Sequence, residues 1–149
     1  MPTHYQGDPK TVLALDTFIK FTRASNALQS RLFQCEIIED LTQSQFGVLE
    51  TLYHLGPLCQ GEVSSKLLTS TGNMTLVLDN LEKRDLVRRV REQSDRRTVR
   101  IYLTDKGKEL IERIFPAIAS EITKEFGVLS VEEQETLGRL CRKLGKKIA

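Results

Sequence analysis

The residues whose types and spacing most clearly indicate a chemical role are the cations between Lys83 and Arg100. This stretch holds eight Lys or Arg residues against three acids, a net charge of +5, whereas the whole chain carries only +2. A basic block in an otherwise mildly acidic chain is typical of a surface that binds a polyanion. A solvated hairpin with incidental arginines gives the same count, so charge alone leaves both interpretations open.

Small polar residues lie just before this block, at 69–72 (Thr-Ser-Thr-Gly). They suit a turn and N-cap ahead of a helix from about Asn73 to Arg84. That helix has one apolar stripe for the core, made of Met74, Val77, Leu78 and Leu81. Its opposite face is available for the major groove of DNA, and its N-terminus favours phosphate.

Nothing in the spacing of reactive residues indicates catalysis or a cofactor, so we expect no enzyme. His4 and His54 form no metal motif with each other or with cysteines, and we expect no metal site. The three cysteines give no pairwise pattern for disulfides. Cys35 and Cys141 lie on apolar helical stripes and are expected to be inert core residues. Cys59 is expected in a loop; we favour a structural role there and keep it as the candidate redox residue.

The chain has the length of one globular domain, 1–149. Its 40% hydrophobic and 28% charged residues are typical of a globular protein. No apolar stretch is long enough to cross a bilayer, and the polar start of the chain resembles no secretory signal. We therefore expect a cytoplasmic protein with no membrane partner.

The elements that must position these residues are mainly helices. Periodicity predicts a long helix over 10–39, which is too long to pack only on its own chain and indicates a second subunit. Capping boxes predict helix starts at Thr42 and Ser130, and Thr104 caps a helix that Pro116 should kink or break in two. The helix that starts at Thr42 is expected to end at Gly56. The remaining expected elements are a short helix near 60–68 and strands over 86–91 and 98–103.

The fold class is thus mainly α with a small β-hairpin wing. Three short helices followed by a two-stranded hairpin is the order of a winged helix-turn-helix. The hairpin tip carries Arg96 and Arg97, where the minor groove concentrates negative potential.

With these elements in place, the sequence resembles the MarR family of transcriptional regulators. The resemblance rests on four motifs whose order and spacing are specific together: residues 41–49, residues 79–87, Asp95-Arg96-Arg97, and residues 103–107. It implies an obligate homodimer in which 10–38 and 105–148 supply dimerisation helices and 41–104 forms the DNA-binding lobe. It also implies binding to a pseudo-palindromic operator in double-stranded DNA, repression, and release by a small ligand or an oxidant.

The resemblance also assigns site residues by position. The residues implied to contact bases and nearby phosphates are Thr71, Gly72, Asn73 and Thr75. The residues implied to contact backbone phosphates are Ser64 and Ser65. Arg97 matches the wing arginine that enters the minor groove, Asp95 the acid that holds it, and Arg96 meets phosphate. Leu76 departs from the arginine that many relatives carry, so it contacts a thymine methyl or simply packs.

A small-molecule pocket is expected between the dimer helices and the lobe, lined by Phe18, Phe21 and Tyr53. Aromatic residues at helical spacing equally suit a core. Two alternatives to a DNA-binding regulator stay open at this point: a winged-helix module that binds protein without DNA specificity, and a carrier of small ligands.

Overall fold

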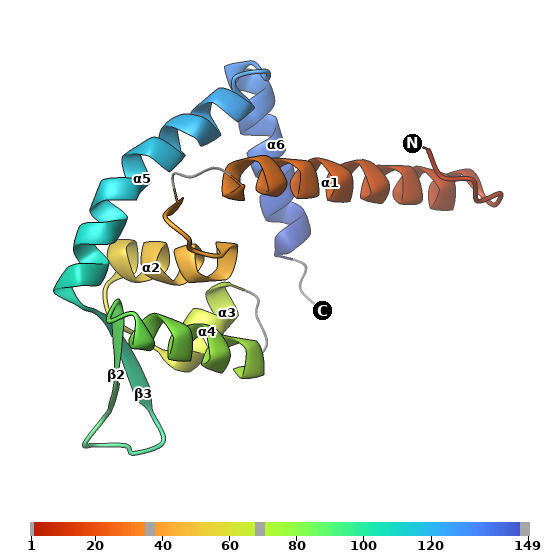
Figure 1. Ribbon diagram of the computed structural model, residues 1–149. Coiled ribbons are helices and arrows are strands. Elements are labelled where there is room, and N and C mark those ends of the chain that lie inside the picture. Colours follow the sequence, from red (N-terminus) through yellow and green to blue (C-terminus); the bar gives the residue numbers. More distant parts are fainter. Residues whose placement is uncertain (1, 35–37, 68–70, 147–149) are drawn as a thin grey trace. The chain divides into compact units, whose positions relative to one another are not determined.

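The computed structural model describes residues 2–34, 38–67 and 71–146. The chain divides into two compact units, which are considered separately: a winged lobe, Phe33–Ile118, and a helical unit, Met1–Leu32 with Ala119–Ala149. The elements follow in the order α1 Pro9–Phe33, α2 Gln43–Leu55, β1 Leu58–Cys59, α3 Gln60–Lys66, α4 Thr71–Lys83, β2 Val87–Arg91, β3 Val99–Leu103, α5 Asp105–Phe126 and α6 Val131–Gly145 (Figure 1). This order confirms the expected fold class.

The core of the winged lobe is aliphatic and joins its helices to its sheet. Fully buried side chains come from α2, α3, α4, β3 and α5: Val48, Leu49, Val63, Met74, Leu78, Leu81, Ile101, Ile111 and Ile118. Burying a side chain of this kind contributes about 1.5–3 kcal/mol relative to leaving it in water. The helices of the lobe are therefore held by one shared apolar contact region, which fixes where their polar faces point.

The wing is a sheet of three antiparallel strands in the order β1-β3-β2. Strand β2 pairs with β3 over its whole length, from Val87 opposite Leu103 to Arg91 opposite Val99. We expected only two strands, and that was wrong: Leu58 and Cys59 form a third, opposite Ile101 and Arg100. A strand of only two residues is too short to show the alternating pattern of a β-strand in the sequence. It forms because β3 lies beside it and pairs with it.

Local signals placed most helix ends correctly. Thr42 and Gln45 form the expected capping box of α2, and Gly56 ends that helix with φ of +79°, a conformation that glycine adopts without strain. Thr104 Oγ1 accepts from the backbone N–H of Gly107 at 3.0 Å, which confirms the predicted cap of α5. Helix α4 begins two residues earlier than expected, so Thr71 and Gly72 belong to its first turn.

The expected extent of the first long helix was wrong. Helix α1 ends at Phe33 instead of continuing to residue 39. Phe33 contacts Phe46 edge to face at a ring separation of 5.7 Å, and Glu39 and Asp40 adopt positive φ, which no helix contains. Of the two effects expected of Pro116, the break is absent, because α5 runs unbroken from Asp105 to Phe126, and the kink stays a prediction.

Gly107 is required by a close approach between α5 and the chain before β2. A Cβ at this position would overlap the backbone carbonyl oxygen of Leu86. That carbonyl also accepts the backbone N–H of Thr104 at 3.2 Å. The junction between the wing and α5 thus depends on a missing side chain.

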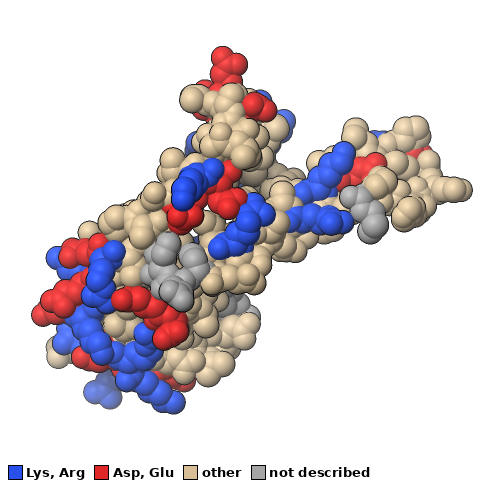
Figure 2. All heavy atoms as spheres, turned by 45° about the horizontal axis from the view of Figure 1, so that its top comes forward, with Lys and Arg blue, Asp and Glu red and all other residues tan. Residues whose placement is uncertain are grey.

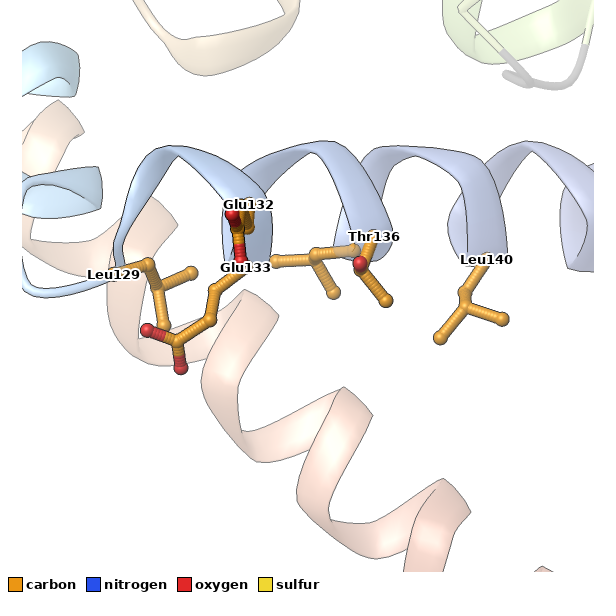
Figure 3. Close-up of a pocket in the computed structure, with 6 residues that line it drawn as sticks. Leu129, Glu132, Glu133, Thr136 and Leu140 are labelled. Carbon is orange, nitrogen blue, oxygen red and sulfur yellow. The ribbon is translucent and has the colours of Figure 1, made fainter.

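The helical unit presents an apolar surface that its own described residues do not cover. Arg31 of α1 pairs with Glu125 near the end of α5 at 2.7 Å, but α6 has no buried residue. Ser130 caps α6 through the predicted box with Glu133. Along α6, Leu137, Leu140 and Leu144 are 37%, 48% and 63% exposed. Figure 3 shows the Leu140 side chain on the same side of the helix as Leu129, beside a hollow of about 460 Å³.

Candidate nucleic-acid interface

Helices α3 and α4 form the helix-turn-helix of the winged lobe. Met74, Leu78 and Leu81 of α4 are fully buried, as the stripe predicted, and Val77 is half-buried. Asn73, Thr75 and Asn80 are exposed on the other side. The apolar stripe therefore determines which face of α4 is available to a partner.

The exposed start of α4 is open and polar. Beyond its chain neighbours and its own helix backbone, no described residue lies within 4 Å of the position that a Cβ of Gly72 would occupy, so a phosphate backbone could come close to it. The structure places Thr71 at the first position of α4, and its side chain lies outside the described residues. Thr75 Oγ1 accepts a hydrogen bond from Gln60 Nε2 at 3.0 Å.

The two serines of α3 differ in exposure. Ser65 is exposed, in agreement with a phosphate contact. Ser64 departs from the expected surface position: it is only 8% exposed, and its hydroxyl has no hydrogen-bond partner among the described residues. Val63, its neighbour in the core, shows that this turn of α3 faces inward. The apolar pattern of α3, a helix of seven residues, is too short to predict which of these adjacent serines is buried.

The tip of the wing is shaped by Asp95, though not as expected. Its carboxylate accepts the backbone N–H of Arg97 at 3.0 Å and the hydroxyl of Thr98 at 3.3 Å. We expected it to orient the Arg97 guanidinium, and its contacts are instead those of a turn in which an acid holds the backbone two residues on. Asp95 thereby fixes the conformation of the tip.

Arg96 and Arg97 are exposed at this tip, and neither has an ion pair within the described ranges. Arg91 Nη1 donates to the carbonyl of Arg96 at 2.8 Å, which further ties the tip to β2. In Figure 1 the hairpin of β2 and β3 extends away from the helices of the lobe. Two cations therefore stand at the end of a braced hairpin.

Two other arginines of the basic block are paired with acids, and a net charge cannot show which cations are paired. Arg89 pairs with Asp79 at 2.5 Å and with Glu82 at 3.1 Å, and it joins β2 to α4. Arg100 pairs with Glu92 at 2.5 Å across the hairpin. Hydrogen bonds from Arg89 lower the pKa of Glu82, and the hydrogen bond with Glu92 raises the pKa of Arg100. Figure 2 accordingly shows red and blue side chains intermingled over the winged lobe.

Cys59 lies in strand β1, directly before α3, and not in a loop as expected. Its Sγ–H donates to Glu62 Oε1 at 2.8 Å, and its backbone N–H donates to the same oxygen at 3.2 Å. These two bonds lower the pKa of Glu62. The thiol is half-buried, which fits the structural role that we favoured. Cys141 is also half-buried, and Cys35 lies outside the described residues.

The three expected pocket residues lie on different units. Phe18 and Phe21 of α1, in the helical unit, are 64% and 45% exposed. Tyr53 of α2, in the winged lobe, borders a surface hollow of about 630 Å³ and donates to Glu112 at 3.4 Å. The pocket itself stays a prediction. His54 packs edge to face on Phe115 at a ring separation of 4.9 Å.

The part of the chain that the structure describes contains neither a cluster of metal-ligating side chains nor a membrane-spanning helix. It contains no cluster of three or more His, Cys, Asp or Glu side chains able to hold a metal ion. Within the same ranges, no helix has the length and apolar character needed to cross a membrane.

Comparison with known proteins agrees with this geometry. Residues 41–99 match the MarR family. The HTH-type transcriptional regulator YkoM of Bacillus subtilis (strain 168) is 34% identical over 132 residues, covering 89% of this chain and 86% of that protein. The HTH-type transcriptional regulator MhqR of the same strain is 33% identical over 135 residues, covering 91% and 93%. The structure of BpsR from Bordetella bronchiseptica is 29% identical with a TM-score of 0.78, covering 87% of this chain and 98% of that one.

Proposed function

The chain belongs to the MarR family of DNA-binding transcriptional regulators, and we propose that it is a homodimeric repressor acting on a pseudo-palindromic operator in the cytoplasm. One observation carries this proposal. A single lobe presents both an exposed polar helix start and a braced hairpin with two arginines outside any described ion pair. The first suits base edges in a major groove, and the second suits the adjacent minor groove.

The proposed contacts divide into those that specify and those that position. Asn73 and Thr75 read base edges, beside Thr71 and Gly72 at the close approach to the backbone. Ser65 and Arg96 contact phosphates, and Arg97 enters the minor groove. Ser64 supports this surface from the core, because its side chain is buried. Asp95 acts by holding the tip in shape.

The dimer is proposed from the uncovered apolar surface of the helical unit. Segments 10–38 and 105–148 would pack against the same segments of a second copy. Leu137, Leu140 and Leu144 lie on one stripe of α6, and covering the exposed part of each contributes about 0.5–2 kcal/mol. A two-fold dimer presents two identical lobes, so its operator must contain two related half-sites.

Selection of bound sequences from random duplex DNA tests the DNA activity directly. We expect enrichment of a pseudo-palindrome whose half-sites are centred about one helical turn apart, roughly 10–10.5 bp. Asn73→Ala should then lose discrimination between operator and random duplex more than it loses affinity for random duplex. Recovery of no enriched sequence would contradict the proposal and favour a module that binds protein. Equal weakening on both DNAs would assign Asn73 to the backbone.

Sedimentation at micromolar concentration tests the dimer. Leu140→Asp should shift the protein toward monomer, because an unpaired charge in an apolar interface is costly. Arg142→Asp is the matched control, since it places the same charge on the opposite face of α6 and should leave the dimer intact. A monomeric parent protein, or dissociation of both variants alike, would refute the assignment of this surface.

Release by an effector is proposed in two forms. In BpsR, 6-hydroxynicotinic acid regulates DNA binding, which supports a small-ligand effector here, with Phe18, Phe21 and Tyr53 as the pocket residues to test. Oxidation at Cys59 is the second form, since the Cys59 thiol is only half-buried and lies directly before α3. Cys59→Ser keeps a donor toward Glu62, so loss of an oxidant response in this variant would identify the oxidant route.

A further inference from the structure

The side chain of Gln60, in α3, forms a hydrogen bond with a residue on the exposed face of α4. Gln60 is the first residue of α3, and its amide Nε2 donates to Thr75 Oγ1 at 3.0 Å across fifteen positions of sequence. Both residues border a hollow of about 290 Å³ together with Arg89, Arg91 and Val99 of the wing. The bond therefore lies in the angle between α4 and the hairpin.

The backbone that carries Gln60 is itself fixed to the wing. Cys59, one residue earlier, pairs with Arg100 in the β1-β3 ladder. The backbone N–H of Cys59 donates to Glu62 one turn into α3. Gln60 thus projects from a point held by both the sheet and the helix, and its amide is a well-placed support for a side chain on α4.

A support of this kind matters for threonine in particular. In a helix the hydroxyl of threonine occupies two alternative χ1 positions, whereas valine and isoleucine keep one. A hydrogen bond between exposed groups is enough to favour one rotamer over another about twofold to threefold. A preference of this size is small against the stability of a domain, yet it is large enough to measure in binding.

We propose that Gln60 is a positioning residue that sets the rotamer of Thr75 and thereby sharpens discrimination at the base pair facing Thr75. This inference rests on the proposed function, because it takes Thr75 to lie against a base edge. Gln60 acts through Thr75, so its contribution should be absent when the Thr75 hydroxyl is absent. Affinity for random duplex DNA, which depends on phosphate contacts, should be unaffected.

A double-mutant cycle with two near-isosteric variants tests this. Gln60→Met keeps the length of the side chain without the N–H donor, and Thr75→Val keeps its shape without the hydroxyl. The measured quantity is the ratio of affinities for the operator and for operators with each single base pair replaced. We expect Gln60→Met to lower this ratio about twofold to threefold, and Thr75→Val to lower it about threefold to tenfold at the same base pair. The double variant should be no worse than Thr75→Val alone.

Several outcomes separate the alternatives. Additive losses in the double variant would overturn the inference and show that Gln60 contacts DNA itself. Equal weakening of Gln60→Met on random duplex would overturn it in favour of a backbone contact. A parent protein without sequence preference would instead refute the proposed function. The 13C shift of the Thr75 methyl group in the absence of DNA gives an independent readout, since a change of rotamer in Gln60→Met should move it while the melting temperature stays constant. An unchanged shift would refute the positioning role.

Discussion

Replacement of Asp95 separates the shape of the wing tip from its charge. The carboxylate makes two hydrogen bonds, to the Arg97 backbone N–H at 3.0 Å and to the Thr98 hydroxyl at 3.3 Å. Each is exposed, so its net contribution lies near the lower end of about 0.5–1.5 kcal/mol. The backbone bonds from Thr98 N to Asp95 O and from Glu92 N to Thr98 O, both 3.0 Å, remain and keep the hairpin closed.

From these contacts, Asp95→Ala should loosen the tip by about 1 kcal/mol without unfolding the wing. Operator affinity should fall about fivefold if this whole cost appears in the bound state. Counting charges alone gives the opposite sign, because the variant removes an acid from a surface that faces a polyanion. Asp95→Asn is the matched control: it removes the charge and keeps an oxygen acceptor for the Arg97 N–H, while its amide N–H can donate to the Thr98 hydroxyl in place of the bond that the carboxylate accepts. It should therefore bind as tightly as the parent or more tightly.

Fluorescence anisotropy with a labelled operator at several salt concentrations measures both effects. The advantage of Asp95→Asn should shrink as salt rises, because electrostatic attraction between exposed charges is screened. The loss in Asp95→Ala should persist, because it arises from geometry. Tighter binding by Asp95→Ala than by the parent at every salt concentration would refute the turn-holding role and reduce the wing to a diffuse basic surface.

Three further predictions concern charge, packing and pH. Arg97→Ala should weaken operator binding and flatten the plot of log affinity against log salt by about 0.9, the value for one lost charge contact; an unchanged slope would remove Arg97 from the interface. Gly107→Ala should lower the free energy of unfolding in denaturant melts by about 1–3 kcal/mol or more through overpacking. Gly61→Ala, where no atom lies within 4 Å, should have no such cost, and equal effects of both variants would refute the close approach. Hydrogen bonds from Arg89 hold the pKa of Glu82 below its ordinary 4.5. The contribution of this pair to the free energy of unfolding is therefore fully present above pH 4.5 and should be lost as the pH falls through the lowered pKa. Glu82→Gln should flatten that acid slope, and an unchanged slope would contradict the pairing.

The features that the sequence predicted correctly are those encoded within a few residues. The box of Thr42 with Gln45 and the cap at Thr104 each involve side chains three positions from the groups they bind. The buried stripe of α4 follows from the repeat of a single helix. Such signals need no knowledge of which elements lie together in space.

The features that sequence reasoning missed depend on partners far along the chain. Strand β1 has no local pattern, and it exists because Arg100 lies opposite Cys59. Ser64 and Ser65 are adjacent and chemically identical, and only the packing of α3 decides that one is buried. Asp95 was expected to hold the side chain of Arg97, but it holds the Arg97 backbone N–H. Sequence spacing shows that two residues are near each other without showing which of their atoms meet.

The ion pairs of the wing explain how a modest net charge can still give a directed basic site. Arg89 and Arg100 are paired with acids, whereas Arg96 and Arg97 lie outside the ion pairs found among the described residues. Exposed ion pairs contribute little to stability, typically about 0–1 kcal/mol, so their main effect here is on geometry. Arg89 joins β2 to α4, whereas Arg96 and Arg97 lie in the turn between β2 and β3, at the end of the hairpin that extends away from the helices of the lobe (Figure 1). The block of net +5 is therefore not uniform: two of its arginines are paired with acids and connect elements, and the two arginines of the tip are exposed and available to a polyanion.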